Sequence, residues 1–232
     1  MRTMVTLLHH PLCPASRAVR LALLESGVEP AFAEVKPWAP TLDFLNINPA
    51  GMLPVLTIDG KTLCGAYPIV EYLSETAKRE GAPSARAAIW TGTPSERAEQ
   101  RRVAEWFLRK FDAEVTQTIL DEKLYKPMSR GRLAPDLGTI RAGRSNLRYH
   151  LSYVSFLSDQ RKWLGGDQIS LADLAASAQI SVMDYLDEMP WTDFPEVKAW
   201  YQRLKSRPSF RPMLADRIPG FNPPEHYANL DF

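Results

Sequence analysis

The residues best placed for chemistry are Cys13 and Pro14, which lie between a short apolar run and a stretch with helical spacing. Proline is tolerated in the first turn of a helix, so we expect Cys13 at a helix N-terminus. There the positive end of the helix dipole favours a thiolate, the nucleophilic form of cysteine. Cys13 is therefore either a nucleophile for thiol–disulfide exchange or a small side chain that fills space beside the sheet.

The other polar motifs predict structural roles. Ser170 and Asp173 have the spacing of a capping box, in which the serine caps a helix and the acid bonds back to it. His9 and His10 are adjacent, so they point to opposite faces of a strand. No acidic or cysteine partner stands at metal-ligand spacing from them, and no metal site is expected.

The chain divides into a first half that predicts both strands and helices and a second half that predicts helices alone. Residues 1–80 predict a β-α-β unit followed by a β-β-α unit, and the first of these implies a parallel strand pair. Asp59 and Gly60 predict a tight hairpin turn. The expected strands are 4–8, 30–35, 54–58 and 61–63, the expected helices are 15–26 and 66–80, and 37–52 is expected to be irregular.

The second half lacks β-rich segments. Residues 81–94 have the composition of a linker, and 95–215 predict an all-helical domain whose first helix is capped by Ser95. The expected helices are 95–125, 136–162, 170–189 and 194–206. The third of these is apolar almost all round, which is typical of a buried central helix.

The tail, residues 216–232, combines four prolines with Phe221, Tyr227, Leu230 and Phe232. The prolines exclude a regular helix, and the tail is too apolar to stay solvated. Together with the loop that carries Trp38, an ordered tail would suit a recognition surface, because aromatic residues dominate binding hot spots. Alternatively, Tyr227 packs back onto the helical domain and Trp38 closes a neighbouring pocket.

Composition excludes several functions. The chain has 232 residues, 45% of them hydrophobic and 24% charged, with a net charge of +1. Such a balance offers no electrostatic footprint for nucleic acid. Two cysteines make no disulfide framework, and no window reaches about 18 apolar residues. We therefore expect a reduced, cytoplasmic protein that neither binds nucleic acid nor inserts into a membrane.

Four stretches in sequence order resemble the glutathione S-transferase superfamily. They are Cys13–Pro14 with Val19–Arg20, then residues 48–55, 69–73 and 166–173. The resemblance implies an α/β N-terminal thioredoxin-like domain followed by an all-α C-terminal domain. It also implies that Pro54 is cis, and that Leu53 offers backbone hydrogen bonds to the cysteinyl unit of glutathione. In an omega-like thiol transferase of this superfamily, Cys13 would be the catalytic residue and glutathione the cofactor.

This sequence departs from the superfamily where glutathione is held. The superfamily has an acid and a hydroxyl before the third helix, which bind the γ-glutamyl group, but here Gly65 and Ala66 occupy those positions. A charge-assisted hydrogen bond is worth about 1.5–3 kcal/mol, so its loss weakens binding roughly 10–100-fold. We therefore expect a vestigial pocket at Cys13, Leu53, Pro54, Gly65 and Ala66, with no cofactor and no catalytic residue.

A narrower resemblance is to a branch of this superfamily found among bacterial cell-division proteins. It covers residues 10–17, 36–38, 163–185, 205–212 and 227–232. It implies a homodimer that binds filaments of the tubulin-like protein FtsZ at the division site and modulates their curvature or bundling to promote constriction. The residues expected to contact FtsZ are Trp38, His226, Tyr227, Leu230, Asp231 and Phe232.

Overall fold

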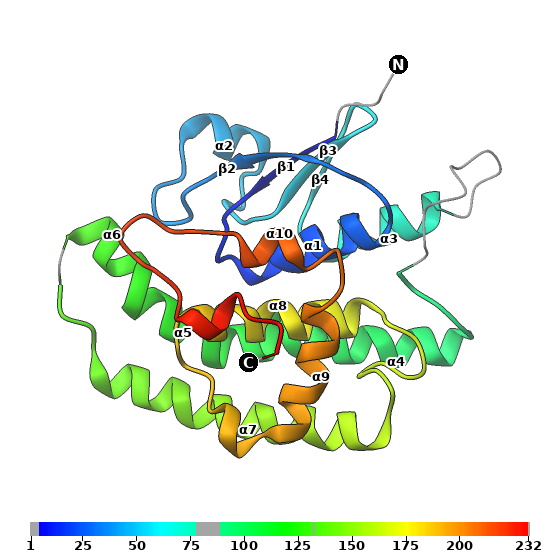
Figure 1. Ribbon diagram of the computed structural model, residues 1–232. Coiled ribbons are helices and arrows are strands. Elements are labelled where there is room, and N and C mark those ends of the chain that lie inside the picture. The colour runs from blue at the N-terminus through cyan, green and yellow to red at the C-terminus, as the bar shows by residue number, and fades with distance from the viewer. Residues whose placement is uncertain (1–4, 78–88, 132, 232) are drawn as a thin grey trace.

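The computed structural model describes residues 5–77, 89–131 and 133–231. A four-stranded sheet with three helices forms the N-terminal domain, and a layer of long helices forms the second domain beneath it (Figure 1). The α/β and all-α domains follow each other in the predicted order. Among the described residues, no helix combines the length and apolar character needed to cross a bilayer.

The sheet has the strand order β2-β1-β3-β4. Its strands are β1 (Thr6–His9), β2 (Ala31–Glu34), β3 (Val55–Ile58) and β4 (Lys61–Cys64). β1 and β2 are parallel, whereas β1–β3 and β3–β4 are antiparallel, as the β-α-β and β-β-α pattern predicts. Asp59 and Gly60 both have positive φ, which the tight turn between β3 and β4 requires.

Helices α1 (Pro14–Glu25) and α3 (Ala66–Thr76) pack against the sheet through an apolar core. Leu7, Val19 and Ile69 are fully buried in it. The expectation of irregular chain over 37–52 is wrong in part, because α2 (Leu42–Ile47) forms there. The hydroxyl of Thr41 accepts a hydrogen bond from the Phe44 N–H at 3.2 Å, and this cap supports the short helix.

One long helical run from residue 94 to residue 130 opens the second domain. It comprises α4 (Pro94–Glu105), a π-helical segment (Trp106–Thr116), α5 (Gln117–Leu120), a second π-helical segment (Asp121–Tyr125) and α6 (Lys126–Arg130). Its cap is Thr93, in a complete capping box with Glu96, and not Ser95. Of the expected linker, residues 81–88 lie outside the described residues, and Ile89 and Trp90 are buried.

The remaining helices are α7 (Leu137–Gln160), α8 (Leu171–Tyr185), α9 (Pro195–Lys205) and α10 (Arg211–Leu214). Every residue of α8 is buried, which confirms the prediction of a central helix. α8 packs against α1 of the first domain as well as against α4. The described part of the tail, residues 216–231, has no regular α-helix and contains one turn of 3₁₀-helix at Glu225–Tyr227.

Candidate functional site

A pocket lies where the sheet domain meets the long helical run, and its lining includes Leu53, Gly65 and Ala66 of the predicted set but neither Cys13 nor Pro54. It has a volume of about 340 Å³ and is lined by Leu53, Cys64, Gly65 and Ala66, with Leu108 on the helical side. The peptide bond between Leu53 and Pro54 is cis, as the resemblance implied. The pocket therefore keeps the backbone frame expected of a glutathione site.

At the start of α3, positions 65 and 66 offer no polar side chain to bind the amino end of glutathione. Gly65 is the N-cap residue and offers no side-chain hydrogen bond, and Ala66 follows it. The charged residues Glu105 and Arg109 on the opposite wall form an ion pair with each other at 3.1 Å. Tyr67 donates its hydroxyl hydrogen to the carbonyl of Arg101 at 3.0 Å. Glu105 and Arg109 thus bind each other, and Tyr67 binds the backbone of the helical domain.

Cys13 is the N-cap residue of α1, but its thiol makes no capping hydrogen bond. The half-buried side chain packs against a small cluster formed by Phe44, Leu53 and Val55. Burial raises the pKa of the Cys13 thiol above its usual value. The predicted effect of the helix end is therefore outweighed, and the arrangement favours the packing role over the nucleophile.

Trp38 is half-buried and not fully exposed. Its ring lies edge-on to His10 with 5.2 Å between ring centroids, and at 5.3 Å from the ring of Tyr125 on the long helical run. The loop of the first domain thereby contacts the second domain through aromatic packing. Part of the Trp38 side chain remains at the surface.

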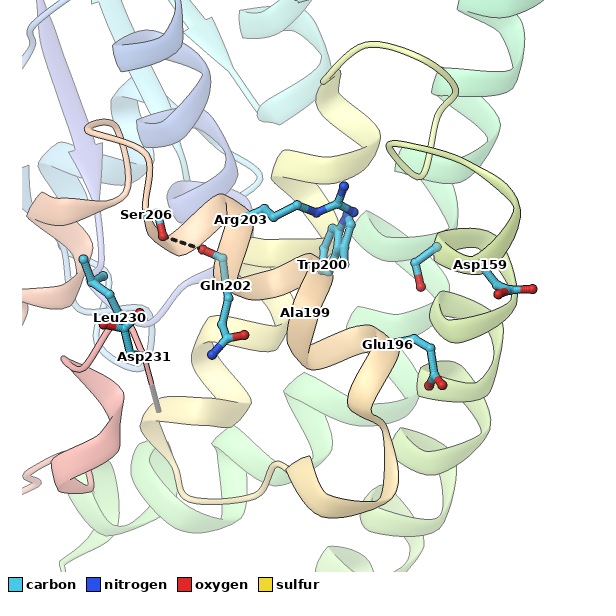
Figure 2. A pocket seen from close by; sticks show the side chains of 10 residues that line it. Asp159, Glu196, Ala199, Trp200, Gln202, Arg203, Ser206, Leu230 and Asp231 are labelled. Carbon is cyan, nitrogen blue, oxygen red and sulfur yellow. Dashed lines mark hydrogen bonds between the residues drawn. The ribbon is translucent and has the colours of Figure 1, made fainter.

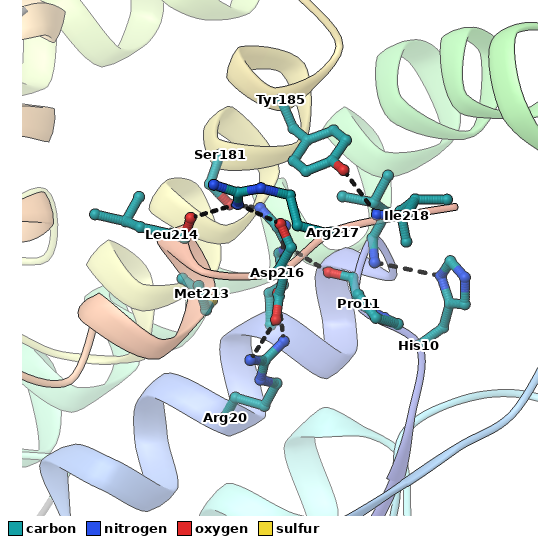
Figure 3. Close-up of polar contacts among 12 residues, drawn as sticks. His10, Pro11, Arg20, Ser181, Tyr185, Met213, Leu214, Asp216, Arg217 and Ile218 are labelled. Atoms are coloured by element: carbon teal, nitrogen blue, oxygen red, sulfur yellow. Dashed lines mark hydrogen bonds and ion pairs between the residues drawn. The ribbon is translucent and has the colours of Figure 1, made fainter. Parts of the chain in front are cut away.

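The tail begins at a buried charge cluster on α1. The guanidinium of Arg20 donates two hydrogen bonds to the Asp216 carboxylate, at 2.7 and 3.0 Å (Figure 3). Arg17 lies 3.6 Å from the same carboxylate, and it donates to the Ser181 hydroxyl at 2.8 Å and to the Pro11 carbonyl at 2.6 Å. The start of the tail therefore ties α1 to α8.

Tyr227 fixes the middle of the tail to the helical core. Its side chain is fully buried, and its hydroxyl donates to the Met213 carbonyl at 3.1 Å. Its ring lies edge-on to that of Tyr185, and the Arg17 guanidinium lies 6.0 Å from its centre. The assignment of Tyr227 to a recognition surface is therefore wrong, because the side chain belongs to the interior of the molecule.

His226 is held by a second buried cluster. Its Nε2 lies 3.0 Å from the Asp184 carboxylate, and its carbonyl accepts a hydrogen bond from Lys205 at 3.1 Å. Asp184 also accepts a hydrogen bond from the Trp191 indole at 3.0 Å. Burial raises the pKa of Asp184 and lowers that of Lys205 to about 8. His226 is one-third exposed, so it anchors the tail and shows only an edge to solvent.

Leu230 and Asp231 lie beyond these anchors, at the rim of a groove along α9 (Figure 2). The groove has a volume of about 680 Å³, and Trp200 and Arg203 of α9 also line it. Leu230 is half-buried and Asp231 is exposed, whereas Phe232 lies outside the described residues. The structure therefore places Leu230 and Asp231 on one groove and His226 against Asp184, while Trp38 contacts His10 and Tyr125.

Ser170 and Asp173 form the capping box that their spacing predicts. The Asp173 carboxylate accepts hydrogen bonds from the Leu164 N–H at 2.8 Å, the Ser170 N–H at 3.2 Å and the Trp200 indole at 3.2 Å. Burial raises the pKa of Asp173 to about 6 despite these three donors. Asp173 thus joins the start of α8 to α9 and to the preceding loop.

Sequence reasoning missed the buried charges Arg17, Asp184 and Lys205 and the largely buried Asp216. Arg17 is preceded by Ser16 and followed by Ala18 and Val19 in α1, so the apolar spacing of this helix gave only a weak signal that the guanidinium would be buried. The partners of these residues lie far away in sequence, so no local pattern reveals them. Within the described part of the chain, no three His, Cys, Asp or Glu residues form a group that could hold a metal ion.

The chain belongs to the glutathione S-transferase family. Residues 7–81 match the model of its N-terminal domain, and residues 145–208 match that of its C-terminal domain. Over 232 residues the chain is 46% identical to FtsZ-localized protein A of Caulobacter vibrioides, with 98% of each chain covered. This relative belongs to the cell-division branch that the sequence motifs resemble.

Solved structures agree with this placement. The structure of FzlA from C. crescentus superimposes with a TM-score of 0.90 at 46% identity, covering 99% of this chain and all of that one. A glutathione S-transferase from Sinorhizobium meliloti superimposes with a TM-score of 0.91 at 50% identity, over 99% of this chain and all of that one.

Proposed function

We propose that this protein is a non-catalytic cell-division regulator that binds FtsZ filaments. It would act in the cytoplasm at the division site as a homodimer, where it would modulate the curvature or bundling of filaments and promote constriction. The observation that carries the proposal is the 46% identity, over nearly the whole of both chains, to a protein named for its localisation with FtsZ.

The pocket supports a role without catalysis. Gly65 and Ala66 offer no side-chain acceptor or donor where an acid and a hydroxyl would hold the amino end of glutathione. Burial raises the pKa of the Cys13 thiol, so at neutral pH its thiolate fraction is even smaller than that of free cysteine. The competing function is a thiol transferase that uses Cys13 and glutathione. It would require polar side chains at positions 65 and 66 and a lowered pKa of the Cys13 thiol.

The anchored tail supports a binding role. Tyr227 and His226 fix the chain just before Leu230 and Asp231, and Leu230 itself packs against the helical core. A recognition segment that is already ordered loses less conformational entropy on binding. We propose that Leu230, Asp231 and Phe232 contact FtsZ, with His226 and the exposed part of Trp38 as further contacts.

Co-pelleting with polymerised FtsZ tests this proposal. The full chain should sediment with filaments, and deletion of residues 230–232 or the change Leu230→Ala should reduce its sedimentation at least tenfold. A deletion that also removed Tyr227 would be uninformative, because that side chain is part of the core. Leu42→Ala is a matched control, since Leu42 is 79% exposed on α2 in the first domain. Full sedimentation after the deletion would contradict the role of the tail.

Glutathione titration separates the two functions. Calorimetry with reduced glutathione should give no binding at micromolar concentrations, and thiol exchange with a mixed disulfide should not depend on Cys13. Micromolar affinity together with loss of exchange in Cys13→Ala would establish the thiol transferase instead. Electron microscopy of FtsZ filaments with and without the protein tests the further proposal that filament curvature changes.

A further inference from the structure

The groove along α9 has a helix as its floor and a wall on each side. In Figure 2 the end of α7, which carries Asp159, lies on one side of α9, and the tail lies on the other. The floor presents small side chains, because Ala199 and Ser206 are exposed there while the side chain of Trp200 is buried. A segment of another molecule can therefore approach α9 closely between α7 and the tail.

Three carboxylates line this groove, one from each of its elements. Asp159 belongs to α7, Glu196 to the first turn of α9 and Asp231 to the tail, and all three are exposed. Within the described residues none of them pairs with a lysine or an arginine, and Glu196 accepts a hydrogen bond from the Ser155 hydroxyl at 3.0 Å. The three negative charges are therefore available to a partner.

Arg203 is the one cation that the described residues contribute to the lining. Its guanidinium lies 5.2 Å from the centre of the Trp163 ring, in a cation–π contact that holds it beside that ring. Three carboxylates against one guanidinium leave the lining with a net charge of −2, although the whole chain carries +1. A concave surface lined by charges of one sign concentrates their field and attracts groups of the opposite sign.

This charge restricts the chemistry of the occupant. A negative groove repels the phosphates of nucleic acids and of anionic lipids. A metal ion needs convergent ligands, and in the described part of the chain no three His, Cys, Asp or Glu residues gather closely enough to supply them. Lysine and arginine side chains fit instead, and arginine fits best because its planar guanidinium donates two parallel hydrogen bonds to a carboxylate.

Apolar atoms accompany these charges. Leu230 is half-buried against the core of the helical domain and also lines the groove, and Ala199 is exposed on α9. Protein–protein contacts commonly combine an apolar centre with a polar rim. The groove therefore suits a polypeptide segment that carries both basic and apolar side chains.

We propose that the groove along α9 receives a basic segment of FtsZ. Lysine or arginine side chains of that segment pair with Asp159, Glu196 and Asp231, and its apolar atoms cover Leu230. The inference rests on the proposed function, extends the contact from the tail to α7 and α9, and assigns the sign of the charge that the filament presents. Electrostatic complementarity of this kind raises the rate of association and fixes its register.

Charge reversal on the two helices tests the groove without altering the tail. Asp159→Lys and Glu196→Lys should each weaken co-pelleting with FtsZ filaments about tenfold, and together about 100-fold, because each change replaces an attraction with a repulsion. Glu75→Lys is the matched control, since it makes the same change of charge at an exposed position on α3 of the first domain and should pellet like the parent.

Circular dichroism shows whether each of these variants folds. Asp159 lies in the last turn of α7, where a cation stabilises a helix, so Asp159→Lys should fold like the parent. Folded Asp159→Lys and Glu196→Lys variants that pellet like the parent would overturn the proposal.

Ionic strength tests the charge itself. Raising the NaCl concentration from about 0.05 M to about 0.3 M should weaken co-pelleting of the parent at least tenfold, because salt screens exposed charges. In the double variant Asp159→Asn with Glu196→Gln the same step should weaken it less than about threefold. FtsZ pelleted alone at each concentration corrects for changes in the mass of polymer. Equal salt dependence in the parent and the double variant would contradict the pairing.

A zero-length cross-link tests the contact directly. A carbodiimide joins a carboxylate to a lysine amine that touches it, and mass spectrometry of the joined peptides should find Asp159 or Glu196 linked to a lysine of FtsZ. These links should disappear in the Asn and Gln double variant. Links from the same carboxylates to a second copy of this chain, with none to FtsZ, would overturn the proposal.

The outcomes separate this inference from the proposed function. A parent protein that does not co-pellet with FtsZ would remove both. A parent that co-pellets, and that loses co-pelleting on deletion of residues 230–232 but tolerates Asp159→Lys and Glu196→Lys, would keep the proposed function and overturn the role of the groove.

Discussion

Arg20 and Asp216 lie 196 residues apart in sequence, yet they form a two-pronged ion pair at 2.7 and 3.0 Å. The pair joins the first helix of the sheet domain to the first residue of the tail. Both side chains are largely buried, with 4% and 12% of their surfaces exposed. The tail therefore contacts both domains, and the residues that hold it in place contribute to the stability of the fold.

Removal of this carboxylate should destabilise the whole chain. In Asp216→Ala the buried guanidinium groups of Arg17 and Arg20 would lose their shared counter-charge. We expect a loss of about 3 kcal/mol in the free energy of unfolding, measured by urea denaturation. Asp231→Ala, at an exposed position, should leave the urea midpoint unchanged. Equal midpoints for the Asp216 variant and the parent would contradict this account.

Asp173 should make stability rise as the pH falls. Its pKa in the folded chain is about 6, above the ordinary value of 3.8, so between these values the folded state holds the proton more tightly than the unfolded state. Compared with Asp173→Asn, which cannot titrate there, the parent should gain about 2 kcal/mol between pH 7 and pH 4.5. Urea denaturation at several pH values measures this difference. A constant difference would show that the carboxylate has an ordinary pKa.

His9 and His10 should make the folded state less stable as the pH falls, opposite to the effect of Asp173. Burial lowers the pKa of each from 6.5 to about 4, helped by Arg20 for His9 and by His9 for His10. The unfolded chain takes up these protons near pH 6.5 while the folded chain does not, so stability is present above pH 6.5 and is lost as the pH falls towards 4.

His10→Asn isolates one of these two contributions. The asparagine can still accept the hydrogen bond that the Leu12 N–H now donates to His10 Nδ1 at 3.2 Å. Between pH 7.5 and 5.5 this variant should lose about 1 kcal/mol less than the parent, measured by urea denaturation at both values. An identical loss in both proteins would mean that His10 is protonated in the folded chain.

Cys13 should react slowly with alkylating agents. Burial raises the pKa of its thiol, so at pH 7.5 iodoacetamide should modify Cys13 no faster than it modifies N-acetylcysteine. Mass spectrometry of the peptide that contains Cys13 distinguishes it from Cys64. A rate ten times above that of the free thiol would indicate an activated nucleophile and would revive the thiol transferase.

The fold was largely predictable because its local signals agree with each other. The Asp59–Gly60 turn, Pro14 at the start of α1 and the Ser170 capping box each indicate an element that is present. The short helix α2 was missed because six residues give too little periodicity, and tertiary burial of Phe44 supports it. At the start of α4, Thr93 and Ser95 are both good caps, and Glu96 favours Thr93 because it completes a capping box.

The candidate site was less predictable. The missing acid and hydroxyl at Gly65 and Ala66 can be found in the sequence, since they are departures from a known pattern. The anchors of the tail could not be found, because Asp184 and Lys205 meet His226 only through the packing of α8 and α9. Tyr227 resembles a recognition residue in sequence, and only the three-dimensional structure shows that it is buried.

The buried position of Arg17 couples the stability of the two domains. It comes from the sheet domain, yet it lies fully buried against Ser181 of the helical domain and over the rings of Tyr185 and Tyr227. Expressed alone, the sheet domain would turn this guanidinium out to water, and the helical domain would be left with an open hollow. The two halves therefore melt together, and calorimetry should record a single cooperative transition where two modules would give two.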